Sequence, residues 1–353
     1  MTDETPEVEK PRPSAPPPRQ APSALRAFEQ PSAARAAWQL VDSFVPYLAT
    51  LWLMYFTIRR GLPWWTTIAL AVPAAGFMVR LFIIMHDCTH SSFLRSRRAE
   101  RVLGRILGVI AFTPFGEWRH SHLGHHATSG DLDRRGIGDV WTMTVREYAA
   151  ATRSKRLLYR VTRTPLLMLL FGPFFIFLWG NRIPPSAATR ERVMSVVYTD
   201  LAIAAIVVAA ALTIGIRTYL AIQAPVLLIG GAWGIWLFYV QHQFEPSYWV
   251  RGQDWSPIPA ALQGSSYFKL PKILQWFSGN IGLHHVHHLR PRIPNYNLQR
   301  CLDATPELDV VPPLTLSGSF RCGRLALWDE EARAFVSFGA VPGAPAPARG
   351  NPG

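Results

Sequence analysis

The chain has 353 residues, 49% of them hydrophobic and only 17% charged, and its formal net charge is +13. A basic balance of this size is often that of a nucleic-acid-binding protein, but no helix-turn-helix, zinc-finger or base-stacking pattern is present, so we expect no nucleic-acid partner. The apolar residues form long runs with basic residues beside them, which is typical of a membrane protein that faces anionic lipid head groups.

The two ends of the chain are rich in proline. Residues 1–35 include the stretch PRPSAPPPRQAPSA, and residues 339–353 read GAVPGAPAPARGNPG. Segments of this composition cannot bury a hydrophobic core. We therefore expect disordered tails at 1–35 and 339–353 around one membrane domain over residues 36–338.

Four apolar runs are long enough to cross a bilayer, which takes about 20 helical residues. Short links at 59–63 and 217–219 predict that each consecutive pair forms a helical hairpin. The predicted fold is therefore an all-α integral membrane protein with four transmembrane helices in two hairpins. The expected spans cover residues 41–58, 64–85, 193–216 and 220–241.

Two other apolar runs, Val102–Phe115 and Leu166–Trp179, are shorter, and Gly172–Pro173 interrupts the second. Runs of about 10–14 residues more often lie in the interface or re-enter the membrane than cross it. A crossing by Leu166–Trp179 would also place the histidines before and after it on opposite sides of the membrane. We expect both runs to lie in the membrane plane or to be re-entrant.

Basic residues set the expected orientation. The segment from His86 to Arg163 carries fourteen Lys and Arg against seven Asp and Glu, which predicts that it is cytoplasmic. With two hairpins, both termini and the C-terminal third of the chain lie on the same side.

All eleven histidines fall in this predicted cytoplasmic layer, in three clusters and one single position. The clusters are HDCTH after the second span, RHSHLGHH, and HHVHH near the end of the domain, and the single histidine ends the fourth span. The histidines are His86, His90, His120, His122, His125, His126, His242, His284, His285, His287 and His288.

Within the clusters the spacing is i, i+3 or i, i+4, which places side chains on one helix face. Nine imidazoles therefore converge, since only His120 and His285 fall outside this register; we expect these two at the surface or beside the ligands. Imidazole suits iron, zinc, copper or nickel. Nine ligands exceed the need of one ion and suit two ions with five or six ligands each.

Together the three clusters resemble the histidine boxes HxxxH, HxxHH and HxxHH of the membrane fatty acid desaturase family. The resemblance covers about residues 40–310. The stretches HHATSGDLDRRGIGDVW, YVQHQFEPSYW and GLHHVHHLRPRIPNYNL are most similar to bacterial acyl-lipid desaturases of the delta-12 (omega-6) type.

This resemblance implies a non-haem di-iron centre that uses O2 and two electrons to insert a cis double bond into an acyl chain. It implies a cytosolic helical cap over four spans, a bacterial inner-membrane location, an acyl-lipid substrate, and a separate donor that is ferredoxin-like or a free cytochrome. The implied ligands are His86, His90, His122, His125, His126, His242, His284, His287 and His288. The expected surrounding residues are Asp87, His120, Asp131, Asp139 and His285.

Two alternative functions remain open at this point. Histidine-box hydroxylases and carotenoid ketolases or hydroxylases share the metal chemistry and differ in the product. A membrane metal-binding or transport protein is a more distant alternative, because transporters place polar ligands near the bilayer midplane. The expected spans hold chiefly Asp200 and Gln223 there, and no histidine.

Overall fold

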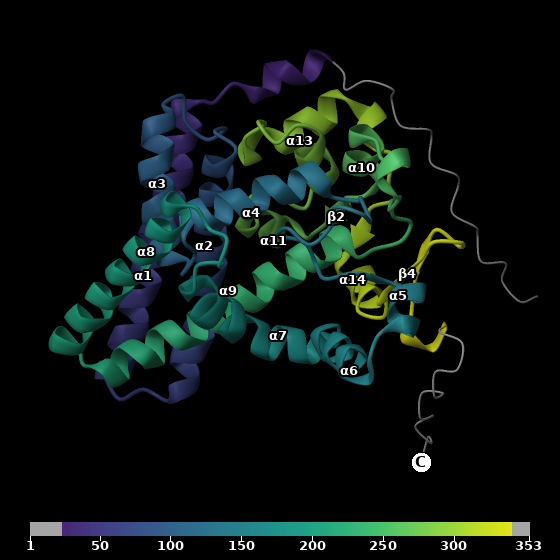
Figure 1. The fold of residues 1–353 in the computed structure, drawn as a ribbon. Helices are drawn as coiled ribbons and strands as arrows, with labels where there is room; N and C mark the ends of the chain where they lie inside the picture. The colour runs from purple at the N-terminus through teal and green to yellow at the C-terminus, as the bar shows by residue number, and fades with distance from the viewer. Residues whose placement is uncertain (1–22, 341–353) are drawn as a thin grey trace, which may run out of the picture.

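The computed structural model describes residues 23–340. Two pairs of long helices, α1 (Ala33–Arg59) with α2 (Trp64–Thr89) and α8 (Arg190–Thr213) with α9 (Ile216–His242), form its apolar body (Figure 1). Helix α2 packs against both α1 and α9 and joins the two pairs. The C-terminal half of α2 is buried on nearly all sides, and its last turn carries the first histidine cluster.

The link in the second pair differs from the prediction. Helix α8 ends at Thr213 and α9 starts at Ile216, so the chain turns at residues 214–215 and not at 217–219. Gly215 adopts a φ of +85° there. Glycine takes this left-handed conformation without the steric cost that a side chain brings, which explains why the turn lies at this residue.

The run at Leu166–Trp179 forms one continuous helical stretch. It consists of α7 (Pro165–Pro173), a π-helical segment η2 (Phe174–Trp179) and the short η3 (Gly180–Arg182). Pro173 lacks an N–H, and the π-helical turns that follow accommodate this loss, so the helix does not end there. Within the described residues, five helices are thus long and apolar enough to cross a membrane, one more than the four expected from the sequence.

The run Val102–Phe115 is divided between two helices, α3 (Arg97–Ile110) and α4 (Phe115–Thr128). The chain turns between them, and Phe112 has a φ of +52°. Neither helix is long enough to be a candidate span. Helix α4 carries the second histidine cluster and packs against α8 and α2.

Short elements cover one end of the apolar body (Figure 1). Most of them follow α9 in the chain, and α12 carries the last histidine cluster. They are α5 (Val145–Ala150), α6 (Arg153–Thr162), η4 (Gly252–Asp254), α10 (Pro257–Gln263), α11 (Lys272–Phe277), α12 (His284–Leu289), α13 (Asn295–Ala304), η5 (Pro306–Leu308), α14 (Leu316–Cys322) and η6 (Phe338–Ala340).

This layer also contains two small sheets, which the all-α prediction did not include. In one, β4 (Leu327–Asp329) pairs in parallel with β1 (Met143–Thr144) and antiparallel with β5 (Ala334–Val336). In the other, β2 (Phe268–Lys269) and β3 (Leu314–Thr315) are parallel. Strands of two or three residues are too short to show an alternating sequence pattern.

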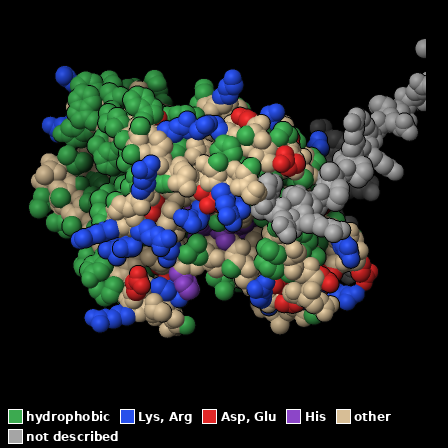
Figure 2. Space-filling view, turned by 90° about the horizontal axis from the view of Figure 1, so that it is seen from above, with side chains coloured by type: hydrophobic (Ala, Val, Ile, Leu, Met, Phe, Trp, Pro, Cys, Tyr) green, Lys and Arg blue, Asp and Glu red, His purple; other side chains and the backbone are tan. Residues whose placement is uncertain are grey.

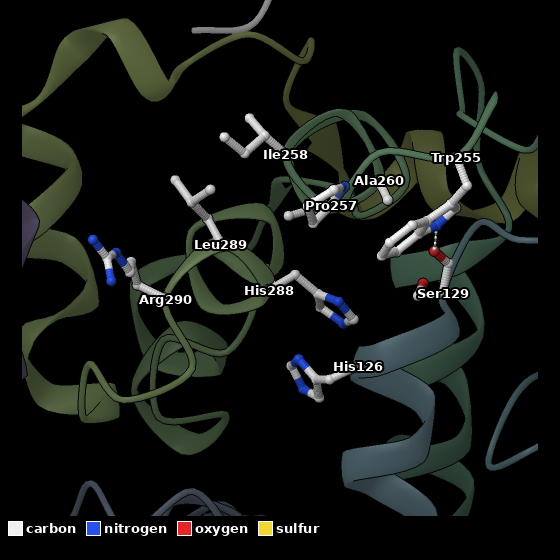
Figure 3. A pocket seen from close by; sticks show the side chains of 10 residues that line it. His126, Ser129, Trp255, Pro257, Ile258, Ala260, His288, Leu289 and Arg290 are labelled. Atoms are coloured by element: carbon white, nitrogen blue, oxygen red, sulfur yellow. Dashed lines mark hydrogen bonds between the residues drawn. The ribbon is translucent and has the colours of Figure 1, made fainter. Parts of the chain in front are cut away.

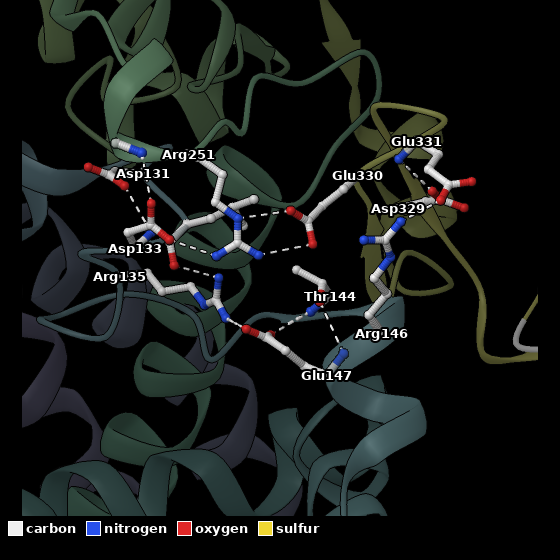
Figure 4. A network of polar contacts seen from close by, with 12 residues as sticks. Asp131, Asp133, Arg135, Thr144, Arg146, Glu147, Arg251, Asp329, Glu330 and Glu331 are labelled. Atoms are coloured by element: carbon white, nitrogen blue, oxygen red, sulfur yellow. Dashed lines mark hydrogen bonds and ion pairs between the residues drawn. The ribbon is translucent and has the colours of Figure 1, made fainter.

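A network of charged side chains fastens the β4–β5 hairpin to the segment that follows α4 (Figure 4). Arg251 pairs with Glu330 at 2.9 Å and with Asp133 at 2.6 Å. Arg135 pairs with Glu147, which also caps the start of α5. The C-terminal hairpin is therefore held against the layer that contains the histidines.

The described part of the predicted N-terminal tail is ordered. Residues Ser23–Glu29 form a 3-10 helix, η1, whose Leu25 is fully buried in the cluster that includes residues of α13. Arg35 also donates a hydrogen bond to Asn297 at 2.9 Å. Contacts with distant residues thus order 23–35, contrary to the prediction, whereas 1–22 and 341–353 lie outside the described residues.

Candidate metal centre

The nine histidines in helical register meet at one place, where α2, α4 and α9 come together with α12 of the covering layer. Their side chains form two groups, and within each group the ligand atoms lie within 4.8 Å of one another. The first group is His86, His90, His122, His126 and His287, and the second is His125, His242, His284 and His288.

The distances within the groups fit metal coordination. His122 Nε2 lies 2.9 Å from that of His90 and 3.1 Å from that of His126. In the second group, His242 Nε2 lies 3.0 Å from those of both His125 and His284. Two nitrogens bound about 2.1 Å from one ion at a right angle are about 3.0 Å apart. Both groups therefore have the spacing of neighbouring ligands around an ion.

Several ring nitrogens that face away from the groups have acceptors. His86 Nδ1 lies 3.2 Å from Asp87 Oδ1, and His125 Nδ1 is hydrogen-bonded to Asp139 Oδ1. His242 Nδ1 lies 3.4 Å from the backbone oxygen of Gly264. A proton held on Nδ1 by such an acceptor leaves the Nε2 lone pair free for a metal.

The environment keeps these imidazoles uncharged. Burial, together with the neighbouring imidazoles, lowers the pKa of His122, His126, His284, His287 and His288 well below the usual histidine value. A neutral ring has a lone pair to give to a metal ion. The described residues of the two groups include no carboxylate, so the positive charge of two ions would be balanced from outside the ligand set.

The residues expected around the ligands occupy different positions. Asp87 and Asp139 contact ligand rings as described above, whereas the Asp131 carboxylate accepts hydrogen bonds from Arg134 Nε and the Asp133 backbone. His120 is exposed on α4. His285 is fully buried and lies beside Tyr267, with ring centroids 5.6 Å apart, and belongs to neither group.

Two contacts of the ligand rings were not expected from the sequence. Trp118 stacks on His122 with ring centroids 4.4 Å apart and an interplanar angle of 12°. Asn295 donates to Asp87 Oδ2 from its backbone nitrogen at 2.7 Å and from its side chain at 2.8 Å. Trp118 lies one helical turn before His122, so the i, i+4 spacing alone could have predicted this contact. Asn295 is distant from Asp87 in the sequence, and only the fold brings the two together.

A largely apolar cavity of about 550 Å³ begins at the histidines and extends between the long helices. His86, His122 and His284 line one end, and residues of α2, α9 and the α7–η3 stretch form its walls. An elongated apolar space of this kind, which ends at the metal groups, suits a hydrocarbon chain.

A second pocket of about 400 Å³ reaches the histidines through the covering layer (Figure 3). His126 and His288, one from each group, stack there with ring centroids 4.1 Å apart. Trp255 and Arg290 also line this pocket. Figure 2 shows a face of the molecule on which histidine side chains are visible between basic ones.

Comparisons with known proteins agree with this arrangement. The profile of a family described as "Fatty acid desaturase" matches residues 63–310. A protein of Bacillus subtilis (strain 168) named "Fatty acid desaturase" is 44% identical over 317 residues, which cover 90% of each chain.

More distant relatives have more specific names. The "sn-1 oleoyl-lipid 12-desaturase" of Synechocystis sp. is 26% identical over 259 residues, covering 67% of this chain and 68% of the relative. The "sn-2 acyl-lipid omega-3 desaturase (ferredoxin), chloroplastic" of Arabidopsis thaliana is 28% identical over 239 residues, covering 64% and 51%.

Proposed function

The chain belongs to the fatty acid desaturase family, and from this premise we propose that it inserts a cis double bond into the acyl chain of a membrane lipid, at the delta-12 (omega-6) position. The observation that carries the proposal is the meeting of two imidazole groups with the end of an apolar cavity. The name of the cyanobacterial relative supports the position of the double bond.

We propose that two iron ions occupy the site, one in each imidazole group. Bound iron would supply the oxidising chemistry with O2 that unactivated C–H bonds require, because no side chain can remove such hydrogens by acid–base catalysis. Overall, one O2, two electrons and two protons are consumed, two hydrogens leave adjacent carbons, and two waters form. The resident ligands would be the nine histidines of the two groups.

The protein's own part in the reaction is positioning. The cavity walls hold the acyl chain so that one pair of carbons lies beside His86, His122 and His284. Asp87 and Asp139 hold protons on His86 Nδ1 and His125 Nδ1, and Trp118 fixes the plane of the His122 ring. The apolar walls exclude water from the reacting carbons.

For the membrane topology, we propose four spans, α1, α2, α8 and α9, under a cytosolic cap. His125 and His242 lie on either side of the α7–η3 stretch in the chain, yet their Nε2 atoms are 3.0 Å apart. An even number of crossings must separate them, and α8 and α9 supply two. The α7–η3 stretch then lies in the membrane plane, which agrees with the exposure of Leu166, Phe171 and Trp179.

We further propose that the desaturase domain, expected from the sequence at residues 36–338 and joined by the packed residues 23–35, lies in a bacterial inner membrane with both termini and the metal site in the cytoplasm. The fourteen basic residues between His86 and Arg163 support this orientation. Reporter fusions at the chain ends and at the 214–215 turn test it: we expect the ends to report cytoplasm and the turn to report the opposite side.

A separate electron donor, either a ferredoxin-like protein or a free cytochrome, is the proposed redox partner. The pocket of Figure 3 gives it a direct approach, because rings of both metal groups line it. The basic side chains beside this opening are Arg290 at its edge, which pairs with Glu29 at 3.4 Å, and Arg134, which pairs with Asp131 and lies over the Trp255 ring at 4.8 Å. An acidic donor is therefore expected.

This docking site predicts the behaviour of an Arg290→Gln variant. Loss of this charge weakens attraction to an acidic donor, so we expect a several-fold lower rate of donor-dependent turnover at low salt and a weaker dependence on ionic strength. Iron content and reduction by a small chemical reductant are expected to stay unchanged. Arg95→Gln, on another exposed basic segment, is the matched control; an equal slowing by both changes would contradict this location.

The reaction itself is tested by expression in a host that lacks polyunsaturated lipids. We expect mass spectrometry of the host fatty acids to show a new cis double bond at the delta-12 position. A double bond elsewhere would correct only the position. A hydroxylated or ketone-bearing product would favour the hydroxylase or ketolase alternative, and metal uptake without any lipid product would favour a metal-binding or transport protein.

A further inference from the structure

Three glycines of α9, Gly230, Gly231 and Gly234, line the apolar cavity, and they differ in what a side chain would meet. A Cβ at Gly230 would lie 2.4 Å from Met78 Cε on α2. A Cβ at Gly231 would lie 2.9 Å from Pro173 Cβ on α7. A Cβ at Gly234 would have no heavy atom within 4 Å. The first two glycines permit close helix packing, and Gly234 faces open space.

Helix geometry shows which space this is. Successive residues of an α-helix are rotated by about 100°, so Gly234 points about 40° from Gly230 and about 60° from Gly231. It therefore points between the direction that contacts α2 and the direction that contacts α7. This is the direction of the cavity that Gly234 lines.

The position along the helix indicates which part of the substrate lies there. Gly234 precedes His242 by eight residues, or about 12 Å along the helix axis. Three polar residues of the cavity, Glu117, Ser121 and Asn181, lie on α4 and η3, and the polar lining residues of α9, Tyr239 and Gln241, lie at its histidine end. Since the polar head of a lipid favours that side, the methyl-terminal part of its acyl chain extends along α9 towards Gly234.

We propose that Gly234 determines the acyl-chain length that the enzyme accepts, because the absence of its side chain leaves room for the methyl-terminal part of a long chain. This inference rests on the proposed desaturase function and adds a specificity-determining residue to it. A larger residue at position 234 shortens the usable cavity while leaving the imidazole groups intact.

The test compares Gly234→Leu and Gly234→Ala with Ala221→Leu, which enlarges an exposed position on the same helix. The readouts are the ratio of longer to shorter desaturated acyl chains, two methylenes apart, and the iron content of the purified protein. One methylene in an apolar pocket changes selectivity by about tenfold or more. We therefore expect Gly234→Leu to lower the ratio at least about tenfold, Gly234→Ala to lower it less, and Ala221→Leu to leave it unchanged.

An unchanged ratio in Gly234→Leu at normal iron content would overturn the inference. If that variant does not accumulate, Gly234→Ala decides, since alanine is a better helix former than glycine. Failure of the wild-type protein to form any double bond would instead overturn the proposed function. The inference would then be tested by binding: long fatty acids should raise the melting temperature of the wild-type protein more than that of Gly234→Leu, and equal shifts would overturn it.

Discussion

His287→Ala is expected to abolish desaturation and to remove at least one iron ion from each chain. His287 is fully buried, and its Nε2 lies 3.1 Å from that of His126. Its ring also lies close to that of His86, with centroids 4.5 Å apart. Loss of a residue that only supports a ligand typically lowers metal affinity by about 10–100-fold, and loss of the ligand itself should exceed this. Elemental analysis of the purified protein and the fatty-acid profile of the host measure both effects.

Two histidines outside the imidazole groups supply the controls. His285→Ala should keep most of the iron, because His285 lies beside Tyr267 and outside both imidazole groups, although the lost packing should lower thermal stability. His120→Ala removes an exposed ring and should change neither the iron content nor the thermal stability. Full iron content in His287→Ala, or loss of iron in His285→Ala, would show that the ligand face of α12 has been assigned wrongly.

Asp87→Asn is expected to lower iron affinity by about 10–100-fold and the free energy of unfolding by about 1–3 kcal/mol. The buried carboxylate accepts from His86 on one oxygen and twice from Asn295 on the other. If the asparagine NH₂ replaced Oδ1, it would face His86 Nδ1–H and favour the tautomer protonated on Nε2, which has no lone pair on the nitrogen that faces the metal group. If the NH₂ replaced Oδ2 instead, it would face the two N–H donors of Asn295.

Asp131→Asn separates these two effects. Asp131 is also fully buried, but its partners are Arg134 and the Asp133 backbone. We expect a loss of thermal stability with unchanged iron affinity. Chelator titration and thermal unfolding of both variants make the comparison, and a similar loss of iron affinity in Asp131→Asn would mean that this carboxylate also acts on the ligands.

The sequence was most informative where local spacing determines geometry. Positions i, i+3 and i+4 of α4 and α12 place His122, His125, His126, His284, His287 and His288 on shared helix faces, as the structure shows. The same spacing predicted that His285 does not share the ligand face of α12, and His285 belongs to neither imidazole group. Local sequence also identified Asp87, which follows His86 directly and whose carboxylate contacts its ring.

Features that depend on distant contacts were not predictable in this way. The partnership of Asn295 with Asp87 and Gln39 joins three helices, and η1 is ordered by packing of Leu25 against distant residues. The strands are too short to leave a pattern. Gly172–Pro173 predicted an interruption of the helix, but α7 includes both residues and π-helical turns follow directly at Phe174–Trp179. The extra candidate span at Pro165–Arg182 follows from that continuity.

The ligands that meet at the metal centre are far apart in the chain, since the first is His86 and the last is His288. Neither imidazole group is complete until the ribosome has synthesised α12, which carries His284, His287 and His288. If the proposed iron ions occupy these groups, their loading is a late step in biogenesis that follows assembly of the four histidine-bearing helices.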